Sequence, residues 1–386
     1  MKIVADENIP LLEEAVGPVG EVHALPADAI TPEAVADADA LLVRSVTRVD
    51  ATLLDESRIR FVATATIGTD HVDTAYLARR HIGFAGAAGS NARSVAEYVL
   101  AALCVLGKRT GRRLRDLAVG IVGVGNVGGR LARMLEALGL AVLRNDPPLA
   151  RRTGDPRYLP LDALAEADVV TFHVPLTRTG RDATWHMVNG RLIERLKPGV
   201  WLLNTSRGAV AETDALADAA DAGRLGALVC DVWEGEPDIP SALLKRADLA
   251  TPHVAGYSYD GKAGGTRMVL EALCEHFGIE RPWDPAPHMP PPPVPRVEVD
   301  AGAGLEEALG RAVRAAYDIE RDDRRLRGML RRPSAERAAY FASLRREYPV
   351  RREFPATTVA LAEADTEVAD ALRAVGFTVE TPGGQT

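Results

Sequence analysis

An arginine, a glutamate and a histidine in the middle of the chain have side chains suited to the oxidation of an alcohol. That reaction removes a proton from oxygen and a hydride from carbon. The proton needs a base that titrates near neutrality, which favours His253. A carboxylate held against the imidazole, such as Glu236, would fix its tautomer and stabilise the imidazolium. The planar guanidinium of Arg207 suits a 2-hydroxycarboxylate.

Each of these residues taken singly has a structural alternative. A lone histidine is often buried and satisfied, a lone arginine often forms a surface ion pair, and a lone loop glutamate is usually solvated. Here, however, Arg207 follows the predicted strand Val200–Thr205, and His253 ends the predicted strand Leu249–His253. Open α/β sheets bind their ligands at the carboxyl ends of the strands. The ordered set therefore favours a catalytic interpretation.

A glycine-rich loop supplies the second chemical signal. The strand Ala118–Val122 leads into it, and an amphipathic helix follows. Gly123 would make the tight turn, Gly125 would let the backbone approach a pyrophosphate, and Gly128 would let helix and strand pack closely. The helix N-terminus favours negative charge. The predicted loop residues are Gly123, Val124, Gly125, Asn126, Val127 and Gly128.

An acidic residue favours NAD over NADP. Asp146 closes the second predicted strand, where a carboxylate can accept the adenosine ribose hydroxyls and repels a 2′-phosphate. Three nearby arginines weaken this preference, namely Arg144, Arg151 and Arg152. Val174, at the end of another predicted strand, is a further candidate cofactor contact, and His173 is expected to pack beneath the cofactor.

Short apolar runs alternate with helical patterns over most of the chain, which predicts βαβ units and parallel sheets. The first series of strands comprises Lys2–Asp6, Glu21–Pro26, Ala40–Ser45, Arg60–Thr66 and Ile82–Ala87. A helix is expected over 92–109. The second series comprises Ala118–Val122, Leu140–Asp146, Ala167–Val174, Val200–Thr205, Leu225–Val232 and Leu249–His253.

A change in composition separates a C-terminal module. Seven of the eleven residues 285–295 are proline, which predicts a stiff linker. Beyond it we expect helices at 304–330, 334–346 and 366–375, and a frayed tail at Gly383–Thr386. The expected strands there are Arg296–Ala301, Thr357–Leu361 and Phe377–Glu380.

The predicted fold class is α/β, with two Rossmann-like doubly wound parallel-sheet domains and a small C-terminal α+β domain. The expected boundaries are 1–95 for a substrate-binding domain, completed by about 257–284, then 96–256 for a NAD-binding domain and 285–386 for the C-terminal domain.

Composition excludes several classes of function. A net charge of −8 argues against non-specific nucleic-acid binding, and it means that local arginines must attract any anionic substrate. The three cysteines show no metal-ligand spacing, so no metal site is expected. The sequence has no long apolar run typical of a membrane span or a signal peptide, so a cytoplasmic protein is expected.

Three segments resemble the signature blocks of the D-2-hydroxyacid dehydrogenase family, and the resemblance covers roughly residues 1–280. The segments are Asn204–Ala209, Asp231–Pro237 and Thr251–Gly256. The resemblance implies that His253 is the acid/base, that Glu236 supports it and that Arg207 grips the carboxylate. It also implies cofactor contacts from Thr205, Ser206, Arg207, Asp231 and Gly256.

Four further stretches are similar to one branch of that family, which oxidises 4-phospho-D-erythronate in vitamin B6 biosynthesis and has a C-terminal dimerisation domain. They are Asp6–Pro10, Leu42–Thr47, Ala65–Asp73 and His253–Tyr257, whereas Asn91–Val95 departs from the more apolar run expected there. This resemblance implies NAD-dependent oxidation of a phosphorylated 2-hydroxyacid by a homodimer. Alternatives are another D-2-hydroxyacid dehydrogenase, of phosphoglycerate or glycerate type, and a non-catalytic NAD-sensing protein.

The same branch implies substrate contacts from Ser45, Thr66 and Tyr257. Arg44 could hold a phosphate, although strand-end arginines without that role are common. A C-terminal cluster is a hypothetical second phosphate clamp, with a solvated basic face as the alternative; it comprises Arg345, Arg346, Arg351 and Arg352.

Overall fold

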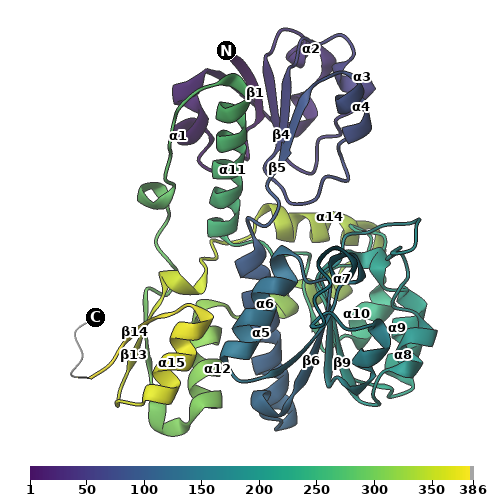
Figure 1. The fold of residues 1–386 in the computed structure, drawn as a ribbon, viewed down its shortest axis with the longest axis vertical. Helices are drawn as coiled ribbons and strands as arrows, with labels where there is room; N and C mark the ends of the chain where they lie inside the picture. The colour runs from purple at the N-terminus through teal and green to yellow at the C-terminus, as the bar shows by residue number, and fades with distance from the viewer. Residues whose placement is uncertain (383–386) are drawn as a thin grey trace. The chain divides into compact units, whose positions relative to one another are not determined.

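The computed structural model describes residues 1–382, and their contacts divide them into two compact units (Figure 1). Unit 1 contains residues 1–91 and 258–290. Unit 2 contains residues 92–257 and the chain from 291 onward, of which 291–382 are called the C-terminal segment below. The tail predicted at Gly383–Thr386 lies outside the described residues. The predicted three-domain boundaries stay predictions.

Unit 1 is a parallel five-stranded sheet in the order β2-β1-β3-β4-β5. This is the order of a doubly wound nucleotide-binding-like fold. The strands are β1 (Lys2–Asp6), β2 (Glu21–Leu25), β3 (Ala40–Val43), β4 (Phe61–Thr64) and β5 (Gly83–Gly86). The helices are α1 (Leu12–Val16), α2 (Pro32–Val35), α3 (Ala51–Leu54), α4 (Thr74–Arg79) and α11 (Tyr259–Phe277).

The side chains along each strand of unit 1 point alternately to the two faces of the sheet, so an apolar layer forms on each face. Val4, Leu41 and Val62 belong to one core cluster, together with residues of α2, α3 and α4. Ile3, Leu42 and others belong to the second, together with α1 and α11. Successive strand side chains point to opposite faces, so a strand buried on both faces reads as a continuous apolar run. The helix α11 returns to unit 1 far along the sequence and covers one of these faces.

Unit 2 contains a parallel six-stranded sheet in the order β11-β10-β9-β8-β6-β7. A single parallel bridge from Arg144 to Tyr158 extends it beyond β7, which gives the strand order of a dinucleotide-binding sheet. The strands are β6 (Ala118–Val122), β7 (Ala141–Asn145), β8 (Val169–Phe172), β9 (Val200–Asn204), β10 (Leu225–Cys230) and β11 (Leu249–Ala250). The helices are α5 (Ala92–Thr110), α6 (Asn126–Ala137), α7 (Pro147–Thr153), α8 (Gly190–Arg195), α9 (Thr213–Asp221) and α10 (Ser241–Arg246).

The C-terminal segment shares the core of unit 2. Its helices α12 (Leu305–Ala316) and α15 (Thr366–Val375) contact α5 and α6, and their apolar residues belong to one cluster with that face of the sheet. Figure 1 shows α12 beside α5, and α15 contacts α12 and α6. The segment also has a parallel sheet in the order β12-β13-β14, and a helix α14 (Ser334–Arg346). The strands are β12 (Arg296–Val299), β13 (Thr358–Leu361) and β14 (Thr378–Glu380).

The helix predicted over 304–330 is interrupted. The structure has α12, then α13 (Ile319–Arg327), then a short 3-10 turn. Tyr317 is extended at the break, and its hydroxyl donates to the buried carboxylate of Asp322. Asp318 then caps α13 by accepting from the N–H of Arg321. Capping and burial of Tyr317 thus end a pattern that helical periodicity alone would continue.

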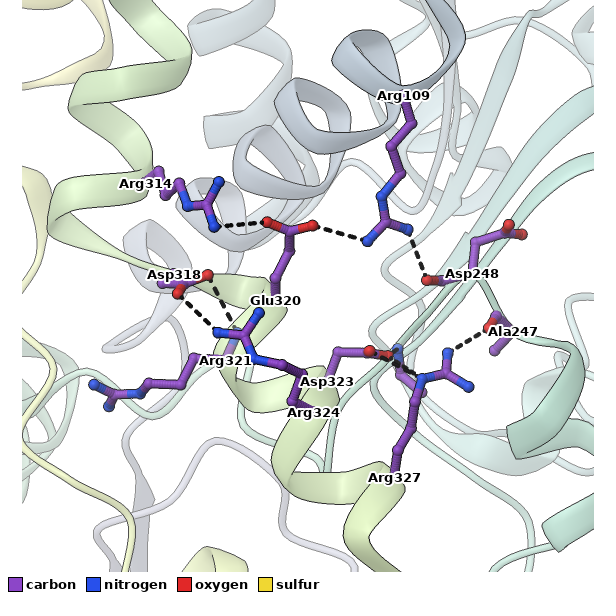
Figure 2. A network of polar contacts seen from close by, with 11 residues as sticks. Arg109, Ala247, Asp248, Arg314, Asp318, Glu320, Arg321, Asp323, Arg324 and Arg327 are labelled. Atoms are coloured by element: carbon purple, nitrogen blue, oxygen red, sulfur yellow. Dashed lines mark hydrogen bonds and ion pairs between the residues drawn. The ribbon is translucent and has the colours of Figure 1, made fainter. Parts of the chain in front are cut away.

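The helix α13 covers the edge strand β11 (Figure 2). Asp323 is 7% exposed and accepts from the N–H of Ala250 at 2.8 Å. Arg327 donates to Asp323 and to the carbonyl of Ala247. Around them, Glu320 pairs with Arg109 and Arg314. An uncovered edge would present unpaired backbone groups, and here the carboxylate of Asp323 satisfies one of them, the N–H of Ala250.

Replacement of Asp323 tests this contact. Asp323→Ala leaves the N–H of Ala250 and Nε of Arg327 without their acceptor, so we expect a loss of about 2–4 kcal/mol in the free energy of unfolding. Urea denaturation measures it. The control is Asp370→Ala, which removes only an exposed pair with Arg373 and is expected to cost less than about 0.5 kcal/mol. Equal stability of the two variants would contradict the assignment.

Candidate active site

The glycine loop has the geometry that a dinucleotide requires. Gly123 has a φ of +85°, and a Cβ there would lie 2.6 Å from the carbonyl oxygen of His173. A Cβ on Gly128 would lie 2.0 Å from the carbonyl oxygen of Gly123, so helix and turn pack too closely for any side chain. A Cβ on Gly125 would meet nothing within 4 Å, which leaves backbone open to a phosphate. Asn126 and Val127 begin α6, whose first N–H groups favour an anion.

Asp146 lies at the end of β7, next to this loop. Its carboxylate accepts from the N–H of Val124 at 2.8 Å and caps α7 through the N–H of Leu149. Arg144 pairs with Glu136 and Arg151 pairs with Asp182, so both arginines already have carboxylate partners. The pairing supports the preference for NAD that Asp146 predicts.

The residues beside the glycine loop come from the end of β8 and from Thr205, which follows β9. His173 contacts the hydroxyls of Thr171 and Thr205, one at each ring nitrogen, at 3.1 Å. Desolvation lowers the pKa of His173 to about 3, so the ring is neutral at physiological pH. Val174 follows it, and its Cγ1 would lie 2.8 Å from a Cβ on Gly123. These contacts fix the position of the His173 ring, and its predicted packing beneath the cofactor stays a prediction.

Asn204 shapes the turn that carries Arg207. Its side-chain oxygen accepts from the N–H and the hydroxyl of Ser206, and its amide donates to the carbonyl of Arg207 at 3.0 Å. Arg207 donates to the carbonyl of Ser206. A Cβ on Gly208 would overlap the backbone of Trp233 at 2.0 Å, so the turn is pressed against the neighbouring loop. Asn204 was not among the predicted site residues, although it opens the first signature segment.

His253 and Glu236 form the predicted pair. Nδ1 of His253 lies 2.8 Å from Oε2 of Glu236, whose other oxygen accepts from the N–H of Trp233. His253 has a φ of +58°, a left-handed conformation that non-glycine residues rarely adopt. Such strain persists only where the surroundings hold it.

The protonation state of Glu236 follows from these contacts. Burial alone would raise its pKa, but the hydrogen bond and charge of His253, the N–H of Trp233 and the charge of Arg345 outweigh burial, so the pKa is lowered. Glu236 therefore stays ionised at neutral pH. Its stabilising interaction with His253 is lost only when the pH falls through that lowered pKa.

Asp231 holds the turn that contains His253. The carboxylate is 1% exposed and accepts from the hydroxyl of Thr251 and the N–H of Val254 through one oxygen, and from the N–H of Ala255 through the other. Thr251 donates to this carboxylate, so the hydroxyl of Tyr98 donates to Thr251. The cofactor contact predicted for Asp231 stays a prediction beside this structural role.

Arg207, Glu236 and His253 line one pocket of about 340 Å³. The same pocket contains Arg178 and Trp185, which sequence reasoning missed because they belong to no signature segment. Trp185 is 44% exposed, stacks on His186, and has the guanidinium of Arg178 5.7 Å above its ring. The three predicted catalytic residues are thus brought together within unit 2.

The predicted substrate residues Arg44, Ser45 and Thr66 belong to unit 1. Arg44 donates to the buried carboxylate of Asp6 at 3.1 Å, so it is an ion-pair residue as well as a candidate phosphate ligand. Ser45 is exposed just after β3. The hydroxyl of Thr66 contacts that of Thr64 at 2.7 Å.

Gly256 and Tyr257 follow the turn that contains His253, in unit 2. The hydroxyl of Tyr257 accepts from Nε of Arg345, in α14, at 3.1 Å. The C-terminal segment therefore reaches a predicted substrate residue. Among residues 1–382, no group of three or more His, Cys, Asp or Glu side chains could hold a metal ion, and no helix is long and apolar enough to cross a membrane.

Comparison with known families matches two regions of the chain. Residues 87–255 match the family described as D-isomer specific 2-hydroxyacid dehydrogenase, NAD binding domain. Residues 288–376 match a family described as a domain of unknown function, DUF3410. The first match and the loop geometry agree, and NAD is the cofactor.

Curated relatives match nearly the whole chain. An erythronate-4-phosphate dehydrogenase of Marinobacter nauticus is 47% identical over 98% of this chain and 99% of its own length. One of Salinibacter ruber is 49% identical over 93% and 94%. Among solved structures, the TT0316 protein of Thermus thermophilus has a TM-score of 0.61 and 27% identity, covering 73% of this chain and 99% of its own. An Aquifex aeolicus D-lactate dehydrogenase complexed with NAD and lactic acid has a TM-score of 0.59 and 24% identity, covering 72% and 96%.

The role of Glu236 is testable by a near-isosteric change. Glu236→Gln keeps a hydrogen-bond acceptor but cannot stabilise the imidazolium of His253, so we expect kcat for the NAD-dependent reaction to fall about 10²–10⁴-fold with little change in the Kd for NADH. Steady-state kinetics and NADH fluorescence titration measure both. Asp238→Asn, an exposed carboxylate in the same loop, is the control and should keep wild-type turnover. Wild-type kcat in Glu236→Gln would refute the pairing as a catalytic device.

Proposed function

The chain belongs to the erythronate-4-phosphate dehydrogenases of the D-2-hydroxyacid dehydrogenase family, and from this premise we propose that it oxidises 4-phospho-D-erythronate to 2-oxo-3-hydroxy-4-phosphobutanoate in vitamin B6 biosynthesis. The observation that carries the proposal is the His253–Glu236 pair, which faces the same pocket as Arg207. A carboxylate-binding cation and a supported base are what oxidation at C2 of a 2-hydroxyacid requires.

The position of the proton follows from the hydrogen bonds of His253. Nδ1 is bonded to an ionised carboxylate, so it carries a hydrogen, and Nε2 is the atom left to act as base. Nε2 takes the proton of the C2 hydroxyl as the carbonyl forms, and Glu236 stabilises the resulting imidazolium. NAD, when bound at the glycine loop, supplies the acceptor for the C2 hydride.

Arg207 orients the substrate in this scheme. Its guanidinium suits the C1 carboxylate and can polarise the forming carbonyl. Asn204 and Gly208 hold the turn on which it lies. The intact set of Arg207, Glu236 and His253 also argues against a non-catalytic NAD-sensing role.

A substrate panel tests the proposed function. Purified protein with NAD is assayed for NADH formation with 4-phospho-D-erythronate, 3-phospho-D-glycerate and D-glycerate, and a 2-oxo-acid acceptor is included to regenerate retained cofactor. We expect the highest kcat/KM for 4-phospho-D-erythronate. Turnover of phosphoglycerate or glycerate without turnover of the erythronate would overturn the substrate assignment. Tight NAD binding without turnover of any of them would favour the sensing alternative.

We also propose that the protein is a homodimer assembled through its C-terminal segment. Support comes from the family resemblance and from the additional sheet β12-β13-β14 of the C-terminal segment. A cytoplasmic location is proposed as well, and the three free cysteines suit a reducing compartment.

The proposed dimer is tested by its mass in solution and by the protection of its backbone amides from deuterium exchange. Light scattering should give twice the chain mass of 41.3 kDa at micromolar concentration. Deuterium exchange on dilution should deprotect peptides from 291–382 first. A monomer mass at all concentrations, or protection confined to other regions, would refute this assembly.

A further inference from the structure

The proposed substrate carries two anionic ends, and only one has an assigned cation. Arg207 takes the carboxylate, while the phosphate remains. Because the net charge of the chain is −8, the overall field repels such a substrate, and a local cation must hold the phosphate. Nε of Arg44 already pairs with the buried carboxylate of Asp6, which compensates its charge, whereas Arg345 has no carboxylate partner within residues 1–382.

Arg345 brings a positive charge to the catalytic residues from the last turn of α14. Its Nε donates to the hydroxyl of Tyr257 at 3.1 Å, and its guanidinium carbon lies 5.5 Å from the centre of that ring. Burial raises the pKa of Glu236, and the charge of Arg345 helps to lower it, after the larger effects of His253 and of the N–H of Trp233. Arg345 is therefore close to both a predicted substrate residue and the catalytic pair.

The terminal N–H groups of the Arg345 guanidinium are available to a ligand. The bond to Tyr257 uses Nε alone, and within residues 1–382 neither terminal nitrogen of Arg345 has a hydrogen-bond or carboxylate partner. The side chain is half-buried, which restricts its motion. A planar fork with both terminal groups available matches two phosphate oxygens.

Buried side chains of the C-terminal segment hold Tyr257 in the position where it contacts Arg345. The ring of Tyr348 meets that of Tyr257 edge to face at 5.7 Å. The hydroxyl of Tyr348 donates to Asp322, which is 2% exposed and also accepts from Tyr317. The position of Tyr257, and with it the bond to Arg345, thus depends on buried side chains of the C-terminal segment.

Three other arginines near the site have partners of their own. Arg346 pairs with Glu347 on the surface, and Arg351 is 4% exposed and donates to the carbonyls of Ala255 and Ser94. Arg178 lies in the pocket but is exposed and stacked on Trp185. Of the predicted C-terminal clamp, Arg345 is the member whose terminal nitrogens are available beside Tyr257.

We propose that Arg345, presented by the C-terminal segment and oriented by Tyr257, binds the phosphate of the substrate and sets the preference for phosphorylated over unphosphorylated 2-hydroxyacids. The inference rests on the proposed function, because it presupposes a phosphorylated substrate. It gives the C-terminal segment a direct part in specificity.

The test compares the two classes of substrate in one variant. Arg345→Gln is assayed with 4-phospho-D-erythronate and with D-erythronate, after its folding and its Kd for NADH are shown to equal those of the wild type. We expect kcat/KM for the phosphorylated acid to fall about 10–100-fold, mainly through KM, with D-erythronate turnover nearly unchanged. Arg345→Lys should recover part of the loss. Arg346→Gln, the exposed neighbour, should behave as wild type.

The outcomes separate the possible failures. Equal losses for both substrates, reproduced by Tyr257→Phe, would mean that Arg345 only positions Tyr257 and would overturn the inference. An unchanged ratio of the two kcat/KM values would also overturn it. If the wild type does not turn over 4-phospho-D-erythronate, the proposed function itself fails. If Arg178→Gln and not Arg345→Gln abolishes the preference, the phosphate ligand is Arg178.

Discussion

The geometry of the candidate active site depends on the hydrogen bonds that the buried carboxylate of Asp231 accepts. This carboxylate accepts hydrogen bonds of 2.6 to 3.0 Å from the hydroxyl of Thr251 and from the N–H groups of Val254 and Ala255. These are the groups on either side of His253, whose backbone is left-handed. Without an acceptor there, two N–H groups would be buried without partners, and the turn would relax toward an unstrained conformation.

Elements distant in sequence also form hydrogen bonds to the turn that contains His253 and to the residues beside it. The hydroxyl of Tyr98, on α5, donates to Thr251, and Arg351 donates to the carbonyl of Ala255. Asp323, on α13, accepts from Ala250 just before the turn. The C-terminal segment thus supports the turn of the candidate active site, in addition to its proposed roles in dimerisation and phosphate binding. Without that segment, the turn would lack the contacts of Arg351 and Asp323.

Much of the fold was predictable because its periodicities are local. The strands Lys2–Asp6 and Ala118–Val122 and the helix 334–346 coincide with their predictions. Most other strands were predicted one or two residues too long at an end. The strand predicted at Leu249–His253 is shorter, because after Ala250 the backbone leaves the ladder to bond Asp231. The helix predicted over 304–330 breaks at Tyr317 because a buried tyrosine and a cap compete with helical continuation.

By itself, the sequence predicted the cofactor loop, the candidate catalytic residues and the succession of strands along the chain, since these depend on residue types at short spacings. Tertiary structure alone decided that Arg144 and Arg151 are neutralised, that Asp231 supports a strained turn, and that Arg345 is the arginine beside Tyr257. Each of these facts is a contact between residues of different structural elements. No periodicity records such contacts, because only the packing of distant elements brings them together.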